Sequence, residues 1–287
     1  MTLYPTLDYL LIGHITADLT PNGRIAGGTV SYAARTAAAF GLRVGLLTSV
    51  QRDEPVTASV LPYVHDTVVL PAGETTTFEN IYTPQGRIQY VRGAAARIAK
   101  ADVPAAFLPV PLVHLAPIAD EIDWDVAALF PNAVTLLTLQ GWLRRWDADG
   151  RVHFKRWHDA ETLKHIDMVV FSEEDIVEAP ELEAEFAGTV EHLFVTRAEK
   201  GGTYYHWGDP QPYSTPVVEL VHPTGAGDVF AASLLASFAA FDGDIRAATE
   251  AAARLAAISV TRVGLDSAPT PDEVGTALAA VRQGRSV

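Results

Sequence analysis

The stretch Pro223-Thr-Gly-Ala-Gly-Asp228 is followed directly by an apolar run over residues 229–241. Its two glycines let the backbone turn tightly, so that several N–H groups at the start of the following helix can point at one place. Such a place attracts an anion, for example a phosphate group. Asp228 itself fits two roles: an acid favoured by the positive end of the helix dipole, or a general base that takes a proton from an attacking hydroxyl. The stretch therefore predicts a phosphate site, with Asp228 as its candidate base.

Short apolar runs alternate with alanine-rich stretches along the rest of the chain. Seven runs are apolar on both faces and predict strands of a central sheet that helices cover on both sides: 9–13, 43–50, 67–70, 112–116, 133–139, 166–171 and 192–196. Crossover helices are predicted over 28–40, 124–130, 160–165 and 180–186, and three closing helices over 226–241, 244–262 and 271–282. This pattern predicts an α/β, doubly wound fold, with residues 1–287 forming one domain.

Residues 74–92 break this rhythm. They alternate polar and apolar side chains about a Pro84-Gln-Gly86 turn, which predicts a half-exposed hairpin. Together with residues 16–25 the hairpin could form a small β-sheet that serves as a lid. The alternative is an edge hairpin of the main sheet.

Charge and composition exclude several classes of function. With 21 Lys+Arg and 35 Asp+Glu, the net charge is 21 − 35 = −14, which argues against nucleic acids and anionic membranes as partners. The absence of cysteine excludes disulfides and thiolate metal sites. The first residues lack the basic segment of a secretory signal, so a cytoplasmic protein is expected. The acidic run over 173–185 is interpreted as a solvated helical face.

These segments together resemble the ribokinase (PfkB) family of carbohydrate kinases, and the resemblance covers nearly the whole chain. Residues 224–228 resemble the C-terminal signature of that family, 13–18 its first strand with a substrate-binding aspartate, and 27–28 its N-terminal signature. The resemblance implies a ribokinase-like fold, with ATP and Mg²⁺ as cofactors. It implies Asp228 as the catalytic base, an anion hole of Gly225, Ala226 and Gly227, and a nucleotide site of Thr196, Ala198, Lys200, Gly201 and Thr224.

The chain departs from the family pattern around the phosphates. His222 stands where the family usually has an aspartate that helps to hold a monovalent cation. Ser172 and Asp175 resemble the ends of the family's Asn-X-X-Glu motif, which organises magnesium, so Asp175 or Glu174 would take the metal role. Ala198 replaces a common glycine in the turn near the nucleotide.

The substrate end resembles the inositol-kinase-like branch over 27–34 and 139–145, which favours a cyclitol such as myo-inositol. Tyr32 stands where sugar kinases usually have asparagine, so a phenol fills part of the pocket. The substrate-binding residues are predicted to be Asp18, Gly27, Gly28, Ser31, Tyr32, Gln140 and Arg144, with Asn80 or Gln89 as further amides.

Several alternatives stay open at this point. Arg144 and Arg145 could be exposed cations at the end of a helix, or one of them could enter the cleft and balance the transferred phosphate. The substrate could be a nucleoside such as adenosine or cytidine. A catalytically weak, polyol-binding regulatory protein would also fit the departures at His222, Ser172 and Ala198. A homodimer through the hairpin would cover its exposed strand edges.

Overall fold

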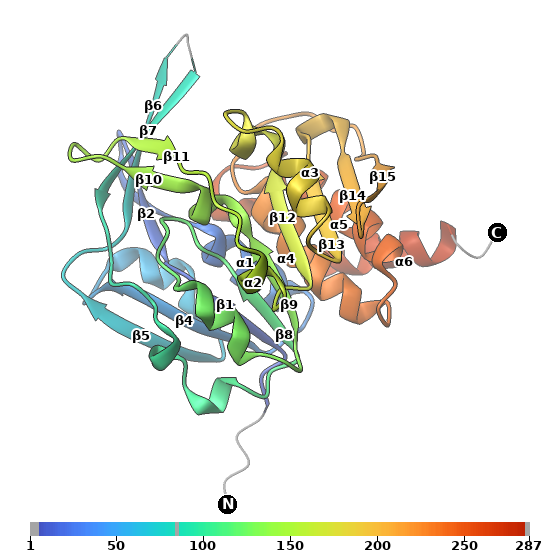
Figure 1. Cartoon of the computed structure of the whole chain (residues 1–287), viewed down its shortest axis with the longest axis horizontal. Helices are drawn as coiled ribbons and strands as arrows, with labels where there is room; N and C mark the ends of the chain where they lie inside the picture. Colours follow the sequence, from blue (N-terminus) through green and yellow to red (C-terminus); the bar gives the residue numbers. More distant parts are fainter. Residues whose placement is uncertain (1–5, 84–85, 285–287) are drawn as a thin grey trace, which may run out of the picture.

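The structure is a computed structural model that describes residues 6–83 and 86–284. Its centre is a nine-stranded sheet with the order β15-β14-β13-β12-β9-β8-β1-β4-β5 (Figure 1). Seven of these strands run parallel and match the seven predicted runs: β1 (Tyr9–Ile12), β4 (Val44–Gln51), β5 (Asp66–Ala72), β8 (Leu112–Leu115), β9 (Val134–Thr138), β12 (Met168–Ser172) and β13 (His192–Thr196). The predicted doubly wound fold is confirmed.

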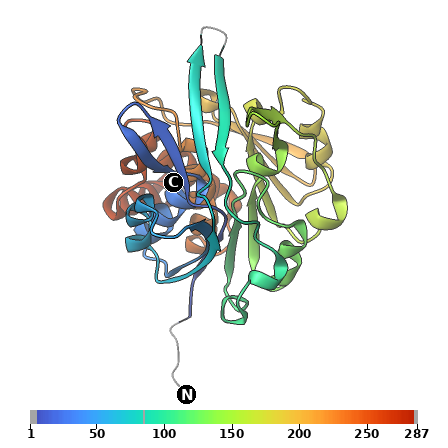
Figure 2. The same ribbon diagram turned by 90° about the vertical axis from the view of Figure 1, so that its left-hand side faces the viewer.

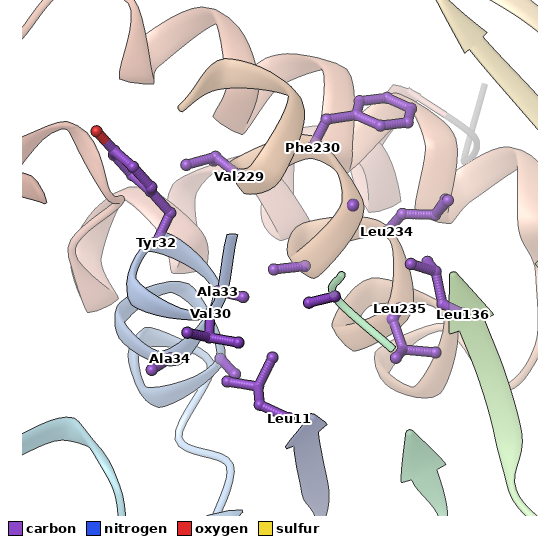
Figure 3. Packing of buried hydrophobic residues seen from close by; sticks show 14 of the residues in the cluster. Leu11, Val30, Tyr32, Ala33, Ala34, Leu136, Val229, Phe230, Leu234 and Leu235 are labelled. Atoms are coloured by element: carbon purple, nitrogen blue, oxygen red, sulfur yellow. The ribbon is translucent and has the colours of Figure 1, made fainter. Parts of the chain in front are cut away.

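Alternate residues of these strands enter two different cores, which explains why both faces are apolar. Along β1, Tyr9 and Leu11 pack on one side and Leu10 and Ile12 on the other. The first side is covered by α1 (Thr29–Ala39), α4 (Ala226–Ala240), α5 (Ile245–Ser259) and α6 (Pro271–Gly284), the second by the shorter α2 (Ala160–Leu163) and α3 (Leu182–Ala187). Figure 3 shows the buried residues between α1 and α4, where Tyr32 of α1 lies near Val229 of α4.

Two antiparallel strands that were not predicted extend the sheet beyond β13. They are β14 (Gly202–His206) and β15 (Asp209–Tyr213), joined at Trp207 and Gly208 with φ of 46° and 83°. Such a two-residue turn with positive φ suits the twist of a hairpin. Pro210 and Pro212 hide β15 in the sequence, and they are tolerated because β15 lies at the edge of the sheet.

Two predicted crossover helices are shorter than expected. Residues 124–130 form a 3₁₀ segment, Trp124–Leu129, rather than an α-helix. Pro131 follows at once and disfavours helical backbone at Phe130, so that the segment cannot lengthen. The helix predicted over 160–165 is the single turn α2, in which Asp159 accepts a hydrogen bond from the Thr162 N–H.

The acidic run over 173–185 is not only a solvated face, as was expected. Arg197 lies 3.3 Å from Glu173 and 2.5 Å from Glu183, and Arg156 lies 2.5 Å from Glu185. These arginines are distant in sequence, and for that reason the run alone does not reveal the pairing.

The small sheet is separate from the main one, which excludes the edge-hairpin alternative. Its strand order is β3 (Gly23–Gly27), β2 (Thr16–Thr20), β6 (Thr77–Thr83) and β7 (Gly86–Gly93). The β6–β7 hairpin stands out from the body of the molecule (Figure 2). Pro84 and Gln85, which were predicted to turn the hairpin, lie outside the described residues. The base of the hairpin is held by a small core of Phe78, Val91, Ile118 and Ala119, with Val152 packed against it.

A further unpredicted hairpin follows β9. Residues 139–143 form a 3₁₀ turn, after which β10 (Arg144–Trp146) pairs with β11 (Val152–Phe154). Arg144 and Arg145 therefore lie on a strand that begins where this 3₁₀ turn ends, and Arg145 is exposed, as one of the two interpretations expects. An isolated bridge between Tyr90 and Arg151 joins this hairpin to β7.

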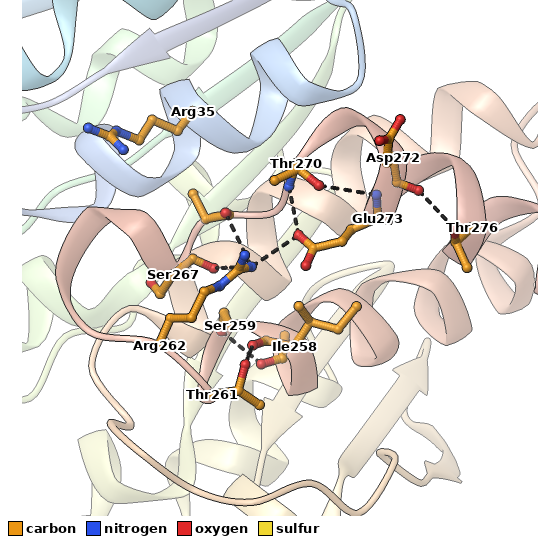
Figure 4. A network of polar contacts seen from close by, with 12 residues as sticks. Arg35, Ile258, Ser259, Thr261, Arg262, Ser267, Thr270, Asp272, Glu273 and Thr276 are labelled. Atoms are coloured by element: carbon orange, nitrogen blue, oxygen red, sulfur yellow. Dashed lines mark hydrogen bonds and ion pairs between the residues drawn. The ribbon is translucent and has the colours of Figure 1, made fainter.

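The closing helices α5 and α6 are tied together by a polar network (Figure 4). The Arg262 guanidinium lies 3.0 Å from the Glu273 carboxylate, which also accepts a hydrogen bond of 2.8 Å from the Thr270 N–H. None of the helices within the described ranges is both long and apolar enough to span a bilayer.

Candidate active site

The N-terminus of α4 offers free backbone donors. Gly225 precedes the helix with φ 89° and ψ −8°, and no side chain in the described part of the chain caps the first turn. A side chain on Gly225 would overlap the Tyr32 ring, so that glycine is required there for space as well as for its positive φ. Around Gly227 there is open space, since no atom lies within 4 Å of a hypothetical Cβ. The first-turn N–H groups of residues 226–228 can therefore receive an anion.

Asp228 lies in the first turn of α4 and is half-buried. Desolvation raises the pKa of its carboxyl to about 6, with smaller contributions in the same direction from Asp175 and Asp18, while Thr29 and Arg144 lower it. These four groups come from several parts of the chain and act on one carboxyl. A carboxylate with a pKa near 6 is a suitable general base at neutral pH, because it is ionised there yet binds a proton more readily than an exposed aspartate.

Thr29 is a site residue that the sequence did not reveal. Its side chain is 1% exposed, and its hydroxyl has no hydrogen bond of good geometry within the described residues, yet it lies near enough to Asp228 to lower the pKa of that carboxyl. Thr29 is the first residue of α1, and the Tyr32 ring one turn later contacts Gly225. Only the packing of α1 on α4 brings these residues together, so no local sequence signal points to Thr29.

Three of the predicted substrate residues, Gly27, Gly28 and Tyr32, lie around Asp18 and its strand β2. A side chain on Gly27 would overlap the Asp18 carboxylate, and one on Gly28 would approach Thr16 to 3.0 Å. The Tyr32 phenol is buried, and its pKa is raised by burial first and then by Asp228 and Asp18. Asp18, Tyr32 and Asp228 thus share one electrostatic environment.

Ser31 is less available to a ligand than expected. It is fully buried, and its hydroxyl donates a 2.5 Å hydrogen bond to the Gly27 carbonyl. Because its hydroxyl is used in this hydrogen bond, Ser31 stabilises the turn before α1.

Asp175 and Gln140 are held together at the ends of β12 and β9. One Asp175 oxygen accepts a 2.8 Å hydrogen bond from the Gln140 amide, and the other accepts one of 2.9 Å from the Ser172 N–H. Glu174 is exposed beside them. Across residues 6–83 and 86–284 no three acids or histidines form a metal site by themselves. A magnesium ion that keeps several waters and shares the phosphates needs only one or two carboxylates, which Asp175 and Glu174 can supply.

The two arginines after Gln140 differ in position. Arg144 donates to the Ile118 carbonyl at 3.2 Å, its guanidinium lies 5.8 Å from the centre of the Phe78 ring, and its charge acts on Asp228. Arg145 is exposed. The charge of Arg144 thus reaches the candidate base, whereas Arg145 is an exposed cation just after the 3₁₀ turn.

The predicted nucleotide residues form a turn between β13 and β14 and a segment before α4. The Thr196 hydroxyl is 3.5 Å from the Phe171 carbonyl, Lys200 is exposed, and Gly201 has φ 86°. The Thr224 N–H donates to His222 Nδ1 at 3.3 Å. His222 thus supports the backbone just before the anion cradle.

Ala198 adopts φ 48°, which is unfavourable for a residue with a side chain. We therefore expect Ala198→Gly to raise the free energy of unfolding by about 0.5–1 kcal/mol, after allowing for the greater flexibility of glycine in the unfolded chain. Denaturant unfolding would measure the change. The control is Ala279→Gly on the exposed side of α6, which should lower stability by about 1 kcal/mol. A loss at both positions would contradict the expectation.

One cavity of the described part of the chain lies elsewhere. It has a volume of about 570 Å³ and lies between β15, the segment 214–216 and α5, where Arg246 and Arg254 line it. None of the predicted site residues borders it, so the chemistry is assigned to the Asp228 region on the grounds of its electrostatics and uncapped helix end.

Comparisons with known proteins agree with this arrangement. Residues 158–273 match the family described as pfkB family carbohydrate kinase. A cytidine kinase from Thermococcus kodakarensis is 28% identical over 263 residues, which cover 81% of this chain and 88% of that protein.

Two solved structures show the same fold. A pyrophosphate-dependent kinase in the ribokinase family, complexed with a pyrophosphate analog and myo-inositol, has a TM-score of 0.79 and 20% identity over 93% of this chain and 99% of its own. Ribokinase from Arabidopsis thaliana, complexed with ribose and ATP, has a TM-score of 0.74 and 18% identity over 96% and 99%. The family resemblance found in the sequence is thereby confirmed over residues 158–273, which match the PfkB carbohydrate kinases, and the kinase relatives support a phosphotransferase that acts on an alcohol group.

Proposed function

We propose that this kinase transfers the terminal phosphoryl group of ATP to a hydroxyl of a small polyol, with a cyclitol such as myo-inositol favoured. The observation that carries this proposal is the position of Asp228. Its carboxyl, with a pKa of about 6, stands in the uncapped first turn of α4 and in the electrostatic reach of Asp18 and Arg144. A base, an anion cradle, a substrate carboxylate and a cation are the groups that phosphoryl transfer to an alcohol needs.

These groups account for the proton transfer and the charge stabilisation of the reaction. Asp228 accepts the hydroxyl proton as the substrate oxygen forms its bond to the terminal phosphorus of ATP, and the bond to the bridging oxygen of ADP breaks. The N–H groups of 226–228 and the Arg144 guanidinium stabilise the charge on the transferred group. Magnesium, held by Asp175 and Glu174, would neutralise phosphate charge when bound. We further propose that the small sheet closes over the substrate as a lid and excludes water.

The face of the small sheet that carries Asp18 supports a polyhydroxylated substrate. Asp18 pairs with Phe78 on the neighbouring strand, so both side chains lie on the same face, and Asn80 follows two residues later. Gln89 stands opposite Asn80 and donates to it at 3.0 Å. Paired amides beside a carboxylate supply donors and acceptors for several ring hydroxyls.

A pyrimidine nucleoside is the second candidate substrate. The curated relative is named as a cytidine kinase, and Ile25, directly opposite Asp18 on β3, is 47% exposed. An exposed apolar side chain next to the substrate carboxylate offers a surface for a base.

ATP is favoured over pyrophosphate as donor by apolar side chains near the anion cradle. The segment before α4 exposes Val217, Leu220 and Val221, and Val263 after α5 is 60% exposed. A nucleotide base would cover such a surface, whereas pyrophosphate has no group to do so.

A matrix of donors and acceptors tests the function. We expect turnover with ATP and magnesium, highest with a cyclitol, when ATP, GTP, ADP and pyrophosphate are each paired with myo-inositol, ribose, fructose, adenosine and cytidine. A higher kcat/KM for cytidine than for every cyclitol would move the assignment to the nucleoside. Transfer from pyrophosphate but not from ATP would refute the assignment of ATP as the phosphoryl donor. Polyol binding in calorimetry without transfer from any donor would favour a binding protein.

A further inference from the structure

The hairpin that carries Arg144 is fastened to the small sheet at its turn. The Val91 N–H on β7 donates to the Gly150 carbonyl at 2.8 Å, and the Arg92 guanidinium donates to the Asp149 carbonyl at 3.0 Å. Gly150 is buried with φ 89°, and a side chain there would overlap the Val91 carbonyl. The backbones of Gly150 and Val91 are thus in direct contact, and a larger residue does not fit at position 150. Figure 1 shows β10 and β11 beside β7. We call residues 147–151 the anchoring turn.

The other end of the hairpin sets the position of Arg144. Arg144 is the first residue of β10 and pairs with Phe154 at the end of β11, and the Lys155 N–H donates to the Leu143 carbonyl at 2.7 Å. The two strands have only three residues each. A two-stranded hairpin of this length is not stable alone, so its geometry depends on what it packs against.

What it packs against is the base of the β6–β7 hairpin. Val152 of β11 contacts the small core formed by Phe78, Val91, Ile118 and Ala119. Arg144 uses the same core, since it donates to the Ile118 carbonyl and lies over the Phe78 ring. The anchoring turn and this core therefore fix the Arg144 guanidinium relative to the small sheet.

We propose that the anchoring turn is a positioning element: its backbone contact with β7 holds Arg144 at the Ile118 carbonyl and over the Phe78 ring, and ties the position of this arginine to that of the small sheet. The inference rests on the proposed function, in which Arg144 stabilises the transferred phosphoryl group. When the small sheet moves over a substrate, the hairpin moves with β7 and brings the arginine to the phosphoryl group. An enzyme with an open sheet then lacks a correctly placed cation, which limits ATP hydrolysis in the absence of substrate.

Gly150→Ala tests the proposal, with Gly208→Ala as its matched control. Gly208 has φ 83° in the exposed β14–β15 turn, and the nearest atom to a Cβ there is 3.6 Å away, so the control carries the same backbone strain without the clash on β7. We expect Gly150→Ala to lower kcat about tenfold with little change in the KM for ATP, and Gly208→Ala to leave kcat unchanged. The acidic limb of the kcat/KM profile should move to higher pH in Gly150→Ala, because the Arg144 charge no longer lowers the pKa of Asp228.

The same pair of substitutions in an Arg144→Ala background completes the test. The effect of Gly150→Ala should vanish there, since the arginine that it displaces is absent. An equal loss of kcat in both backgrounds, or an unshifted pH profile, would overturn the proposal. If Arg144→Ala abolishes turnover while Gly150→Ala retains all of it, the anchoring inference fails and the proposed function stands. If Arg144→Ala has no effect, both fail.

Arg92→Gln is a milder second variant in case Gly150→Ala folds poorly. It removes the contact with the Asp149 carbonyl without strain in the turn. We expect a smaller loss of kcat, about threefold, that also disappears in the Arg144→Ala background. A loss that persists there would contradict the proposal.

Discussion

Asp228→Asn is expected to lower kcat by a factor of about 10²–10⁴ while the KM values change little. A positioned general base contributes rate enhancement in this range, and an amide cannot accept the hydroxyl proton. Asparagine has nearly the same shape, so the first turn of α4 and its contact with Tyr32 are retained. A coupled assay of ADP formation would measure the loss. Full turnover by the variant would refute Asp228 as the base.

The same substitution should stabilise the folded protein. The pKa of Asp228 is raised in the folded state to about 6 from an ordinary value of 3.8, so the folded protein binds this proton more tightly than the unfolded chain does. The contribution of Asp228 to stability therefore falls as pH rises from about 4 to 6, and at pH 7.5 the ionised carboxylate is a net cost.

Removing that cost with asparagine should raise the free energy of unfolding at pH 7.5 by about 1–2 kcal/mol, since one pKa unit corresponds to about 1.4 kcal/mol and partial exposure reduces the penalty. The gain should vanish at pH 4. Denaturant unfolding at both pH values measures it. A variant that is inactive and less stable at pH 7.5 would indicate a damaged helix rather than a lost base.

The sequence predicted the parts of the fold that depend on local pattern. Runs such as 166–171 are apolar on both faces because β12 is covered on both faces, and the three alanine-rich helices follow from composition alone. The separate small sheet was one of two alternatives. Alternating polar and apolar residues show that a strand is half-exposed, but they do not show which strand it pairs with. The strands β10 and β15 were missed because two arginines and two prolines hide them.

The sequence predicted only those parts of the site whose chemistry depends on a single residue type or on one local backbone turn. The uncapped helix end at Gly225 and the carboxylate of Asp228 are of that kind. Thr29 is not, because its relation to Asp228 exists only through the packing of α1 on α4. Likewise the sequence predicted Arg144 as a substrate-binding residue but gave no physical reason to prefer it to Arg145. Their difference in exposure depends on the register of a hairpin that is anchored to β7, far from either residue in sequence.

Arg144→Ala is expected to lower kcat by a factor of about 10²–10³, the range seen when one donor to a developing charge is removed from an active site. Arg145→Ala is the matched control, since Arg145 is the next residue on the same strand, carries the same charge and is exposed. It should retain the activity of the parent protein. Steady-state kinetics with saturating ATP would separate the two.

The pH profile gives Arg144→Ala a second readout that a purely structural loss would not produce. Besides Arg144, the charged groups that act on Asp228 are the acids Asp175 and Asp18, both of which raise its pKa. Without the guanidinium, the raising effects of burial and of these acids are less opposed, so the pKa of the carboxyl should rise above 6 and the acidic limb of kcat/KM should move upward with it. Arg144→Lys should restore much of the pH profile but less of kcat, because an ammonium supplies the charge without the planar fork of the guanidinium. An unchanged profile in Arg144→Ala, together with reduced kcat, would place this arginine outside the electrostatic environment of the base.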